Sequence, residues 1–235
     1  MAISLKRTGS LTTPFVKVLV TGESGAGKTR SLGHFGQDIF IFSHEGGLLS
    51  LRDEDIAYAE VSGVDDIYEA YRWATESKEG SAFSTIGIDS LSDIAEVVLS
   101  AEKKTGKGAK DPRAAYGEMQ DKVGDIIRAF RDMPGKNVIF TSKVEKGQTE
   151  TGELRWVASL PGKKLTADVP YFFDEVLAVR THRASDGTVS RGFQCADDGV
   201  WHAKDRSGRL DPWEPYDLKA IVAKIAAAPL PKVTP

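Results

Sequence analysis

Residues 22–29 read Gly-Glu-Ser-Gly-Ala-Gly-Lys-Thr and match the pattern G-x-x-x-x-G-K-[ST]. Glycines in such a loop let the backbone wrap so closely around an anion that successive N–H groups point at phosphate oxygens. The buried-strand pattern of residues 15–20 precedes the loop, and a helix-compatible stretch follows it to about residue 35. The N-terminus of that helix directs its partial positive charge at the same anion. The segment therefore predicts a nucleotide-binding loop between a strand and a helix.

The loop residues predict a nucleotide site and part of its chemistry. Lys28 would reach the β- and γ-phosphates of ATP and take part in catalysis, and Thr29 would ligate Mg²⁺. Glu23 is a weaker candidate for activating water, because its side chain more often points to solvent. We expect the nucleotide to contact the following residues: Gly22, Glu23, Ser24, Gly25, Ala26, Gly27, Lys28, Thr29 and Arg30.

Two carboxylates follow other apolar runs. Asp89 ends the run Thr-Ile-Gly-Ile-Asp, and we expect its carboxylate beside Thr29 and Mg²⁺. The alternative role for Asp89 is a helix N-cap, which Ser90 could fill instead. Glu45 lies just beyond the run over residues 38–43 and precedes two glycines, so we expect it to polarise the attacking water. The alternative for Glu45 is a solvated loop residue.

Strand and helix patterns alternate over the first 142 residues. Further strands are predicted over 57–61, 85–89 and 137–142, and helices over 64–78, 91–98 and 119–133. This alternation predicts an α/β fold with a mostly parallel central sheet flanked by helices. After residue 142 the pattern changes: strands are predicted over 173–180, 189–195 and 200–203, and a closing helix over 216–227. We therefore expect antiparallel C-terminal hairpins.

The composition limits the class of protein. The 235 residues carry 31 Lys and Arg against 34 Asp and Glu, a net charge of −3, which excludes a histone-like or polybasic binder. The single cysteine, Cys195, excludes an internal disulfide and a metal cage of several cysteines. No apolar run approaches the ~18 residues that span a bilayer, and no secretory signal precedes residue 15. We expect a cytoplasmic protein without a membrane partner.

The order of these motifs resembles the RecA family of ATPases. Residues 138–144 (Val-Ile-Phe-Thr-Ser-Lys-Val) are similar to the RecA strand that ends in a polar sensor, with Ser142-Lys143 where the family usually has Gln or Asn-Gln. Residues 161–174 resemble the region of the second DNA loop. Residues 203–208 (Ala-Lys-Asp-Arg-Ser-Gly) resemble the A-K-x-R-x-G finger of DnaB-type helicases. That finger implies that Lys204 and Arg206 complete the catalytic site of a neighbouring subunit; the alternative is a solvated turn.

Taken together, the chain resembles the small phage-encoded RecA-like ATP-binding proteins, a group that includes single-strand annealing proteins. The resemblance covers roughly residues 14–210 and implies a RecA-like ATPase core. Without an internal repeat or an interdomain linker, we expect one such domain over residues 14–227 after an N-terminal arm over 1–13, and the prolines of residues 228–235 predict a disordered tail. It also implies Mg²⁺-dependent ATP hydrolysis at subunit interfaces of a ring or filament, and recombination by annealing or strand pairing of single-stranded DNA. A single-strand-binding protein is a further candidate partner, in the cytoplasm of a bacterial host.

Basic segments predict where DNA would lie. Residues 102–113 carry five cations against two anions, and such a run is usually only a solvated loop. Residues 143–156 offer three cations and a ring on which a base could stack, and two lysines begin the second DNA loop. The candidate DNA contacts are Lys143, Lys146, Arg155, Trp156, Lys163 and Lys164.

Three other functions fit the same loop and carboxylates. A DnaB-like motor would couple ATP hydrolysis to movement along DNA. A P-loop kinase would transfer phosphate to a small molecule, although no Arg-rich lid pattern is found in the sequence. A non-hydrolysing switch would bind ATP and act through partners.

Overall fold

The structure of the chain is a computed structural model that describes residues 15–44, 46–105, 108–148, 152–183 and 186–227. The arm predicted over 1–13 and the tail predicted over 228–235 lie outside the described residues, as does Glu45. Within these ranges, no helix has both the length and the apolar character needed to cross a membrane.

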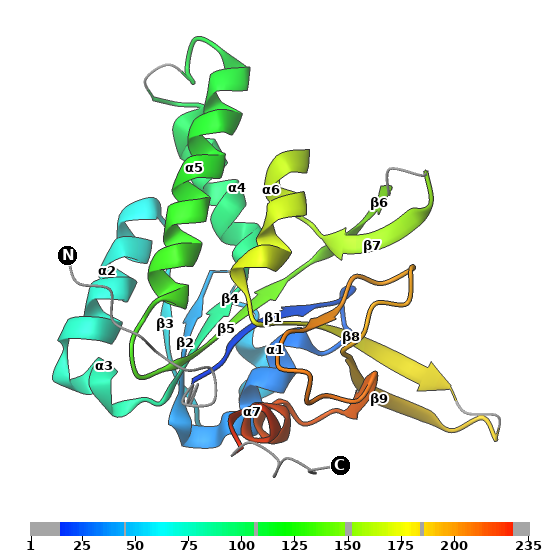
Figure 1. Cartoon of the computed structure of the whole chain (residues 1–235). Coiled ribbons are helices and arrows are strands. Elements are labelled where there is room, and N and C mark those ends of the chain that lie inside the picture. Colours follow the sequence, from blue (N-terminus) through cyan, green and yellow to red (C-terminus); the bar gives the residue numbers. More distant parts are fainter. Residues whose placement is uncertain (1–14, 45, 106–107, 149–151, 184–185, 228–235) are drawn as a thin grey trace, which may run out of the picture.

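A nine-stranded sheet forms the centre of the molecule (Figure 1). Its order is β11-β9-β8-β1-β5-β4-β2-β3, and β10 pairs with β8 off this path. The strands β1 to β5 and β8 are mutually parallel, whereas β9, β10 and β11 are attached by antiparallel pairs. The parallel strands are β1 (Lys17–Thr21), β2 (Ile39–Ser43), β3 (Ala57–Glu60), β4 (Thr85–Asp89), β5 (Asn137–Ser142) and β8 (Glu175–Arg183). The antiparallel ones are β9 (Val189–Gln194), β10 (Lys204–Asp205) and β11 (Trp213–Pro215).

Helices cover both faces of this sheet, with α2, α4 and α5 above it and α1 and α7 below it in Figure 1. The upper layer contains α2 (Val64–Glu76), α3 (Lys78–Ala82), α4 (Leu91–Glu102), α5 (Pro112–Arg131), α6 (Lys163–Asp168) and the 3₁₀ helix η4 (Val169–Phe172). The lower layer contains α1 (Lys28–Leu32), α7 (Leu218–Ala226) and the 3₁₀ helices η2 (Gly33–Asp38) and η3 (Leu48–Leu51). The predicted α/β class, with a mostly parallel sheet and antiparallel C-terminal strands, is confirmed.

Two separate hydrophobic cores follow from the alternation of side chains along buried strands. In β2, Phe40 and Phe42 join the core under α2, α4 and α5. Ile39 and Ile41 of the same strand join the core over α1 and α7. A parallel strand that is buried on both faces reads as a continuous apolar run, which is why residues 38–43 were recognisable in the sequence.

Two segments differ from the sequence prediction. Residues 143–156, expected as a loop, contain most of a hairpin of β6 (Val144–Gln148) and β7 (Leu154–Ala158). The strand expected over 200–203 is reduced to one bridge between Trp201 and Trp156, and regular pairing begins only at β10. The hairpin carries no clear apolar alternation, since every residue of β6 is exposed or only partly buried. The bridge of Trp201, in contrast, depends on a partner 45 positions away that local composition does not specify.

Glu175, the first residue of β8, is fully buried beside β10, and one of its oxygens accepts a hydrogen bond from the N–H of Ser207. Burial, reinforced by the charge of Asp205, raises the pKa of Glu175 from 4.5 to about 8. Between these two pH values the folded chain keeps a proton that the unfolded chain has lost. The free energy of unfolding therefore falls as pH rises through this window.

We expect Glu175→Gln to remove this contribution, which amounts to a slope of at most about 1.4 kcal/mol per pH unit between 4.5 and about 8. Urea unfolding at a series of pH values measures the slope. The variant should gain stability over the wild type as pH rises through the window, and Glu60→Gln at an exposed position of β3 should not. A wild-type advantage that is constant with pH would contradict the assignment.

Candidate functional site

The loop between β1 and α1 has the backbone geometry that its glycines permit. Gly25 has φ of 74° and Gly27 has φ of 111°, a left-handed region that favours glycine. A Cβ at Gly27 would also lie 2.6 Å from the hydroxyl of Tyr216. The Lys28 ammonium bends back across the loop and donates to the carbonyls of Gly22 and Glu23 at 2.9 and 3.0 Å. The loop and the N-terminus of α1 thus form a compact cradle for an anion.

Asp89 lies directly beside this cradle. The hydroxyl of Thr29 donates to one carboxylate oxygen at 2.7 Å, and the hydroxyl of Thr141 in β5 donates to the other. Ser90 accepts a hydrogen bond from the N–H of Asp93 and is the N-cap of α4, so Asp89 does not have the capping role. The structure therefore brings together Thr29 and Asp89, the two residues that the sequence predicts at the metal.

Thr141, rather than Ser142, faces the nucleotide loop. Successive side chains of a strand point to opposite faces, and Ser142 points into the upper layer, 3.1 Å from the hydroxyl of Ser92. Lys143 forms an ion pair with Asp93 at 2.7 Å. The resemblance placed the sensor at Ser142-Lys143, but the residue of β5 that contacts Asp89 is the one before, Thr141.

The end of β2 lies next to the end of β4. Ser43 is paired in register with Asp89, and the N–H of His44 donates to the carbonyl of Asp89 at 2.8 Å. The hydroxyl of Ser43 is buried and has no hydrogen-bond partner among the residues that the structure describes. Glu45, the predicted activator of water, follows immediately but lies outside the described residues.

These groups fit Mg²⁺ bound together with a nucleotide. Thr29, Asp89 and the orphaned Ser43 hydroxyl supply hard oxygen atoms near the anion cradle. The described residues contain no group of three or more His, Cys, Asp or Glu that could hold a metal by themselves. Mg²⁺ in nucleotide sites needs none, because one or two protein oxygens and the phosphates complete its coordination.

Arg191, which the sequence does not predict at the site, forms another of its walls. A cavity of about 320 Å³ is lined by Lys28, Thr29, Arg30 and Arg191, among others. The guanidinium of Arg191 lies over the ring of Tyr216, whose hydroxyl donates to the carbonyl of Gly27. No local signal marks Arg191, because it reaches the loop only through the pairing of β9 with β8 and of β8 with β1.

Lys204 and Arg206 lie at the opposite edge of the sheet from their own nucleotide loop. Lys204 in β10 is paired with Val176 of β8, which is paired with Leu19 of β1. Leu19 precedes Gly22 by three residues, which corresponds to about 10 Å along an extended strand. In addition, β10 pairs with β8 on the side away from β1, so β8 lies between the finger and the strand that leads into the loop. The finger segment is therefore not placed to act on its own chain's site.

Contacts within the chain fix both finger residues near η4. The Lys204 ammonium donates to the carbonyls of Pro170 and Phe173 at 2.8 and 2.6 Å. Arg206 pairs with Asp174 at 3.1 Å and remains 55% exposed. Burial, followed by the charge of Arg206, lowers the pKa of Lys204.

The candidate DNA residues fall into two groups. Lys163 and Lys164 are exposed in the first turn of α6. In the hairpin, Trp156 stacks on Trp201 with ring centroids 5.2 Å apart, and Lys146 lies over the Trp156 ring. Arg155 forms an ion pair with Asp197. The hairpin side chains are thus engaged with the protein itself, whereas the two lysines of α6 are exposed.

Comparison with known proteins identifies the family. The AAA domain family, AAA_24, matches residues 15–207. The chain belongs to this family. The crystal structure of a KaiC-like protein from the hyperthermophilic archaeon Pyrococcus horikoshii aligns with 14% sequence identity and a TM-score of 0.38, covering 76% of each chain. No curated protein matches the sequence.

The chain therefore has the P-loop ATPase core of an AAA domain, built on a mostly parallel central sheet. ATP is the nucleotide that this family implies, and Mg²⁺ is its usual metal. The match begins just before β1 and ends at Ser207, so it includes the loop at residues 22–29 as well as Lys204 and Arg206.

We expect Thr141→Val to weaken Mg²⁺ binding about 10- to 100-fold in the presence of ATP, because Asp89 loses the hydrogen bond that orients one of its oxygens. Nucleotide binding without Mg²⁺ should stay unchanged. Calorimetric titration with Mg²⁺ measures the difference. Ser142→Ala, next to Thr141 but on the opposite face, is the matched control and should keep wild-type affinity. Equal losses in both variants would rule out a specific role for Thr141.

Proposed function

We propose that this AAA domain is an ATP-binding, RecA-like recombination protein. It assembles on single-stranded DNA, promotes annealing or strand pairing, and hydrolyses ATP with Mg²⁺ at the interfaces between subunits. The observation that carries the proposal is the separation of the two halves of the site. The nucleotide loop lies at one edge of the sheet, and Lys204 and Arg206 lie at the other. A second copy must supply the finger if the finger is used.

In this proposal each site residue has a separate role in ATP hydrolysis. The loop N–H groups and Lys28 bind the phosphates, and Thr29 and Asp89 hold the metal, which would neutralise charge on the β- and γ-oxygens. Glu45 polarises the attacking water. Arg206 of the next copy, with Lys204, neutralises charge that develops on the transferred phosphoryl group.

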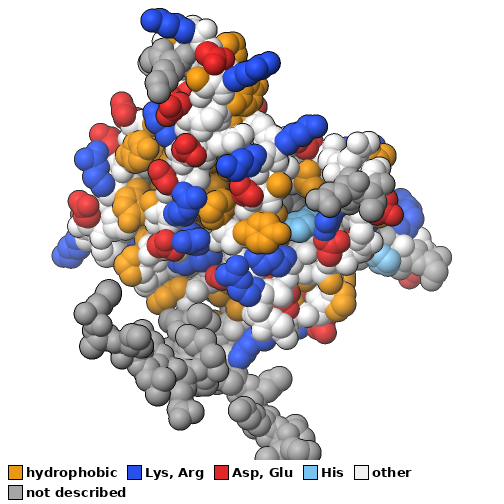
Figure 2. All heavy atoms as spheres, turned by 45° about the horizontal axis from the view of Figure 1, so that its top comes forward, with side chains coloured by type: hydrophobic (Ala, Val, Ile, Leu, Met, Phe, Trp, Pro, Cys, Tyr) orange, Lys and Arg blue, Asp and Glu red, His pale blue; other side chains and the backbone are white. Residues whose placement is uncertain are grey.

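Exposed cations support contact with a single strand. Lys163 and Lys164 present two charges at the start of α6, close in sequence to the finger's partners in η4. Figure 2 brings the top of Figure 1 forward and shows Lys and Arg side chains scattered over that face, with Asp and Glu side chains among them. The net charge of −3 does not prevent such binding, because a strand contacts local groups that repeat from one subunit to the next.

The ATPase prediction concerns Arg206. We expect Arg206→Ala to lower kcat about 10³-fold or more while ATP affinity stays near wild type, since the guanidinium acts on a neighbour's phosphoryl group. Arg183→Ala, at the exposed end of β8, is the control. Mixing Arg206→Ala with Lys28→Ala should restore part of the turnover, because the first subunit keeps an intact loop and the second an intact finger. Wild-type turnover in Arg206→Ala alone would refute the trans site.

The DNA prediction concerns Lys163 and Lys164. We expect the double Ala variant to bind a single-stranded oligonucleotide more weakly, with a salt dependence (log Kd against log salt) shallower by about 1.4, about 0.7 for each lost phosphate contact. Fluorescence anisotropy measures binding, and an annealing assay with complementary strands measures the activity. Unchanged salt dependence would remove these lysines from the interface. Unwinding without annealing would favour the DnaB-like motor. Stimulation of ATP turnover by a small molecule would favour the kinase, and ATP binding without turnover would favour the switch.

A further inference from the structure

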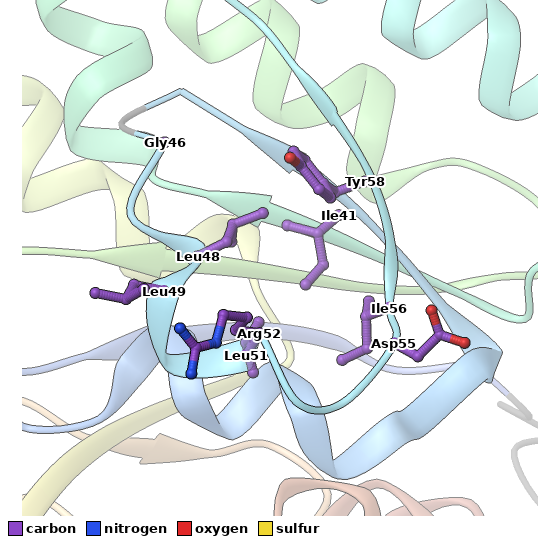
Figure 3. A pocket seen from close by; sticks show the side chains of 9 residues that line it. All are labelled: Ile41, Gly46, Leu48, Leu49, Leu51, Arg52, Asp55, Ile56 and Tyr58. Atoms are coloured by element: carbon purple, nitrogen blue, oxygen red, sulfur yellow. The ribbon is translucent and has the colours of Figure 1, made fainter.

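A cavity lined by both apolar and charged side chains, Arg52 and Asp55 among them, lies next to the nucleotide site beside η3. It has a volume of about 420 Å³ and lies between η3 and the edge strand β3. Figure 3 shows Leu48 and Ile41 pointing toward each other in this cavity, with Tyr58 and Ile56 on the β3 side. Leu49, at the rim, is 79% exposed, and Tyr58 is 53% exposed. We call this cavity the η3 pocket.

The η3 pocket and the nucleotide site share one short segment of chain. Gly46 and Leu49 line the pocket, whereas Gly47 and Ser50 line the cavity of the nucleotide loop. Arg30 of α1 fixes this segment, because it donates to the carbonyl of Ser50 at 2.6 Å and pairs with Glu54 at 2.8 Å. A group seated in the pocket therefore lies immediately beside the phosphate cradle.

An exposed aromatic residue lies next to the finger. Tyr171 in η4 is 77% exposed. Its carbonyl accepts a hydrogen bond from Arg206 at 3.4 Å, and the carbonyl of the preceding Pro170 accepts from Lys204. An exposed tyrosine is the kind of side chain that anchors protein interfaces, because it buries a large area at a low entropic cost.

The two surfaces carry opposite charge. Residues 52–66, four of which line the η3 pocket, contain six acidic residues and one arginine, and Arg30 pairs with one of the six, Glu54. Near Tyr171 lie Arg206, paired with Asp174, and Arg128, which is paired with Asp125 and lies over the ring of Phe172. The preceding helix α6 adds Lys163 and Lys164 at its start and Asp168 at its end. Surfaces of opposite charge favour association in one orientation.

The pocket and the tyrosine also belong to opposite layers of the sheet. Ile41 and Leu51 of the η3 pocket join the core over α1 and α7. Val169 and Phe173, which flank Tyr171, join the core under α4 and α5. A contact between the two surfaces joins unlike faces of two copies, so it propagates head to tail into a ring or a filament.

We propose that Tyr171 of one copy of this chain inserts into the η3 pocket of the next copy and thereby brings Arg206 to that copy's nucleotide loop. This inference rests on the proposed function, because it names the residues that would form the interface between subunits. It adds the residues that select the partner face and the head-to-tail orientation. The pocket receives the tyrosine ring, and the neighbouring charges steer the approach.

Complementary variants test the interface. Tyr171→Asp removes the tyrosine and keeps the pocket, whereas Leu49→Asp places a charge at the rim and keeps the tyrosine. Sedimentation velocity with a non-hydrolysable ATP analogue and no DNA should show self-association of the wild type. Each variant alone should associate about 30-fold more weakly or worse, as expected for an interface anchor. An equimolar mixture should form heterodimers, since one intact tyrosine meets one intact pocket.

The control is Leu154→Asp, which changes another exposed leucine, on β7, and should associate like the wild type. Both test positions are more than three-quarters exposed, so nucleotide binding by each isolated variant should be unchanged. Wild-type association of either variant, no heterodimer in the mixture, or a wild type that stays monomeric would overturn the inference. The assay contains no DNA, so intact assembly with no annealing would reject the proposed function and leave this interface standing.

Discussion

The hydrogen bonds to the Asp89 carboxylate connect the elements on which the site depends. One oxygen accepts from Thr29 at the start of α1, and the other accepts from Thr141 at the end of β5. This arrangement requires β5 to lie between β1 and β4 with the three strands parallel, so that their carboxyl ends meet at one edge. The two hydrophobic cores fix that order, because each inner strand is buried on both faces and cannot slip by one residue without exposing its apolar side chains.

The same sheet separates the two sets of charged groups that hydrolysis uses in our proposal. Parallel strands put the loop and Asp89 at the carboxyl edge, whereas the short antiparallel strand β10 attaches Lys204 and Arg206 at the amino edge of β8. The buried Glu175 lies under this attachment and binds the N–H of Ser207 in the finger turn. The fold thus keeps the finger away from its own loop, and in our proposal a site with both parts forms between copies.

The sequence predicted those parts of the site that local chemistry specifies. The glycine loop, the strand ending in Asp89 and the alternation of strands with helices each depend on residues within one short segment. The side chain of β5 that points to Asp89 could not be predicted in this way, because choosing between Thr141 and Ser142 requires knowing which face of the strand meets α1. Arg191 and Tyr216 were missed for a related reason. They reach the loop through strand pairs and helix packing that join residues more than 160 positions apart.

In our proposal, the distribution of charge reconciles a net charge of −3 with assembly and with binding of a polyanion. Acidic residues gather in 52–66, beside the η3 pocket, and cations gather around η4 and α6. If successive copies join these two surfaces, the acidic segment is covered by the neighbour and its charge is balanced there. In that arrangement Lys163 and Lys164, at the start of α6, stay exposed beside the contact and repeat from copy to copy along the assembly. A single strand laid along them meets a repeated row of positive groups, so assembly itself creates the binding surface that one copy lacks.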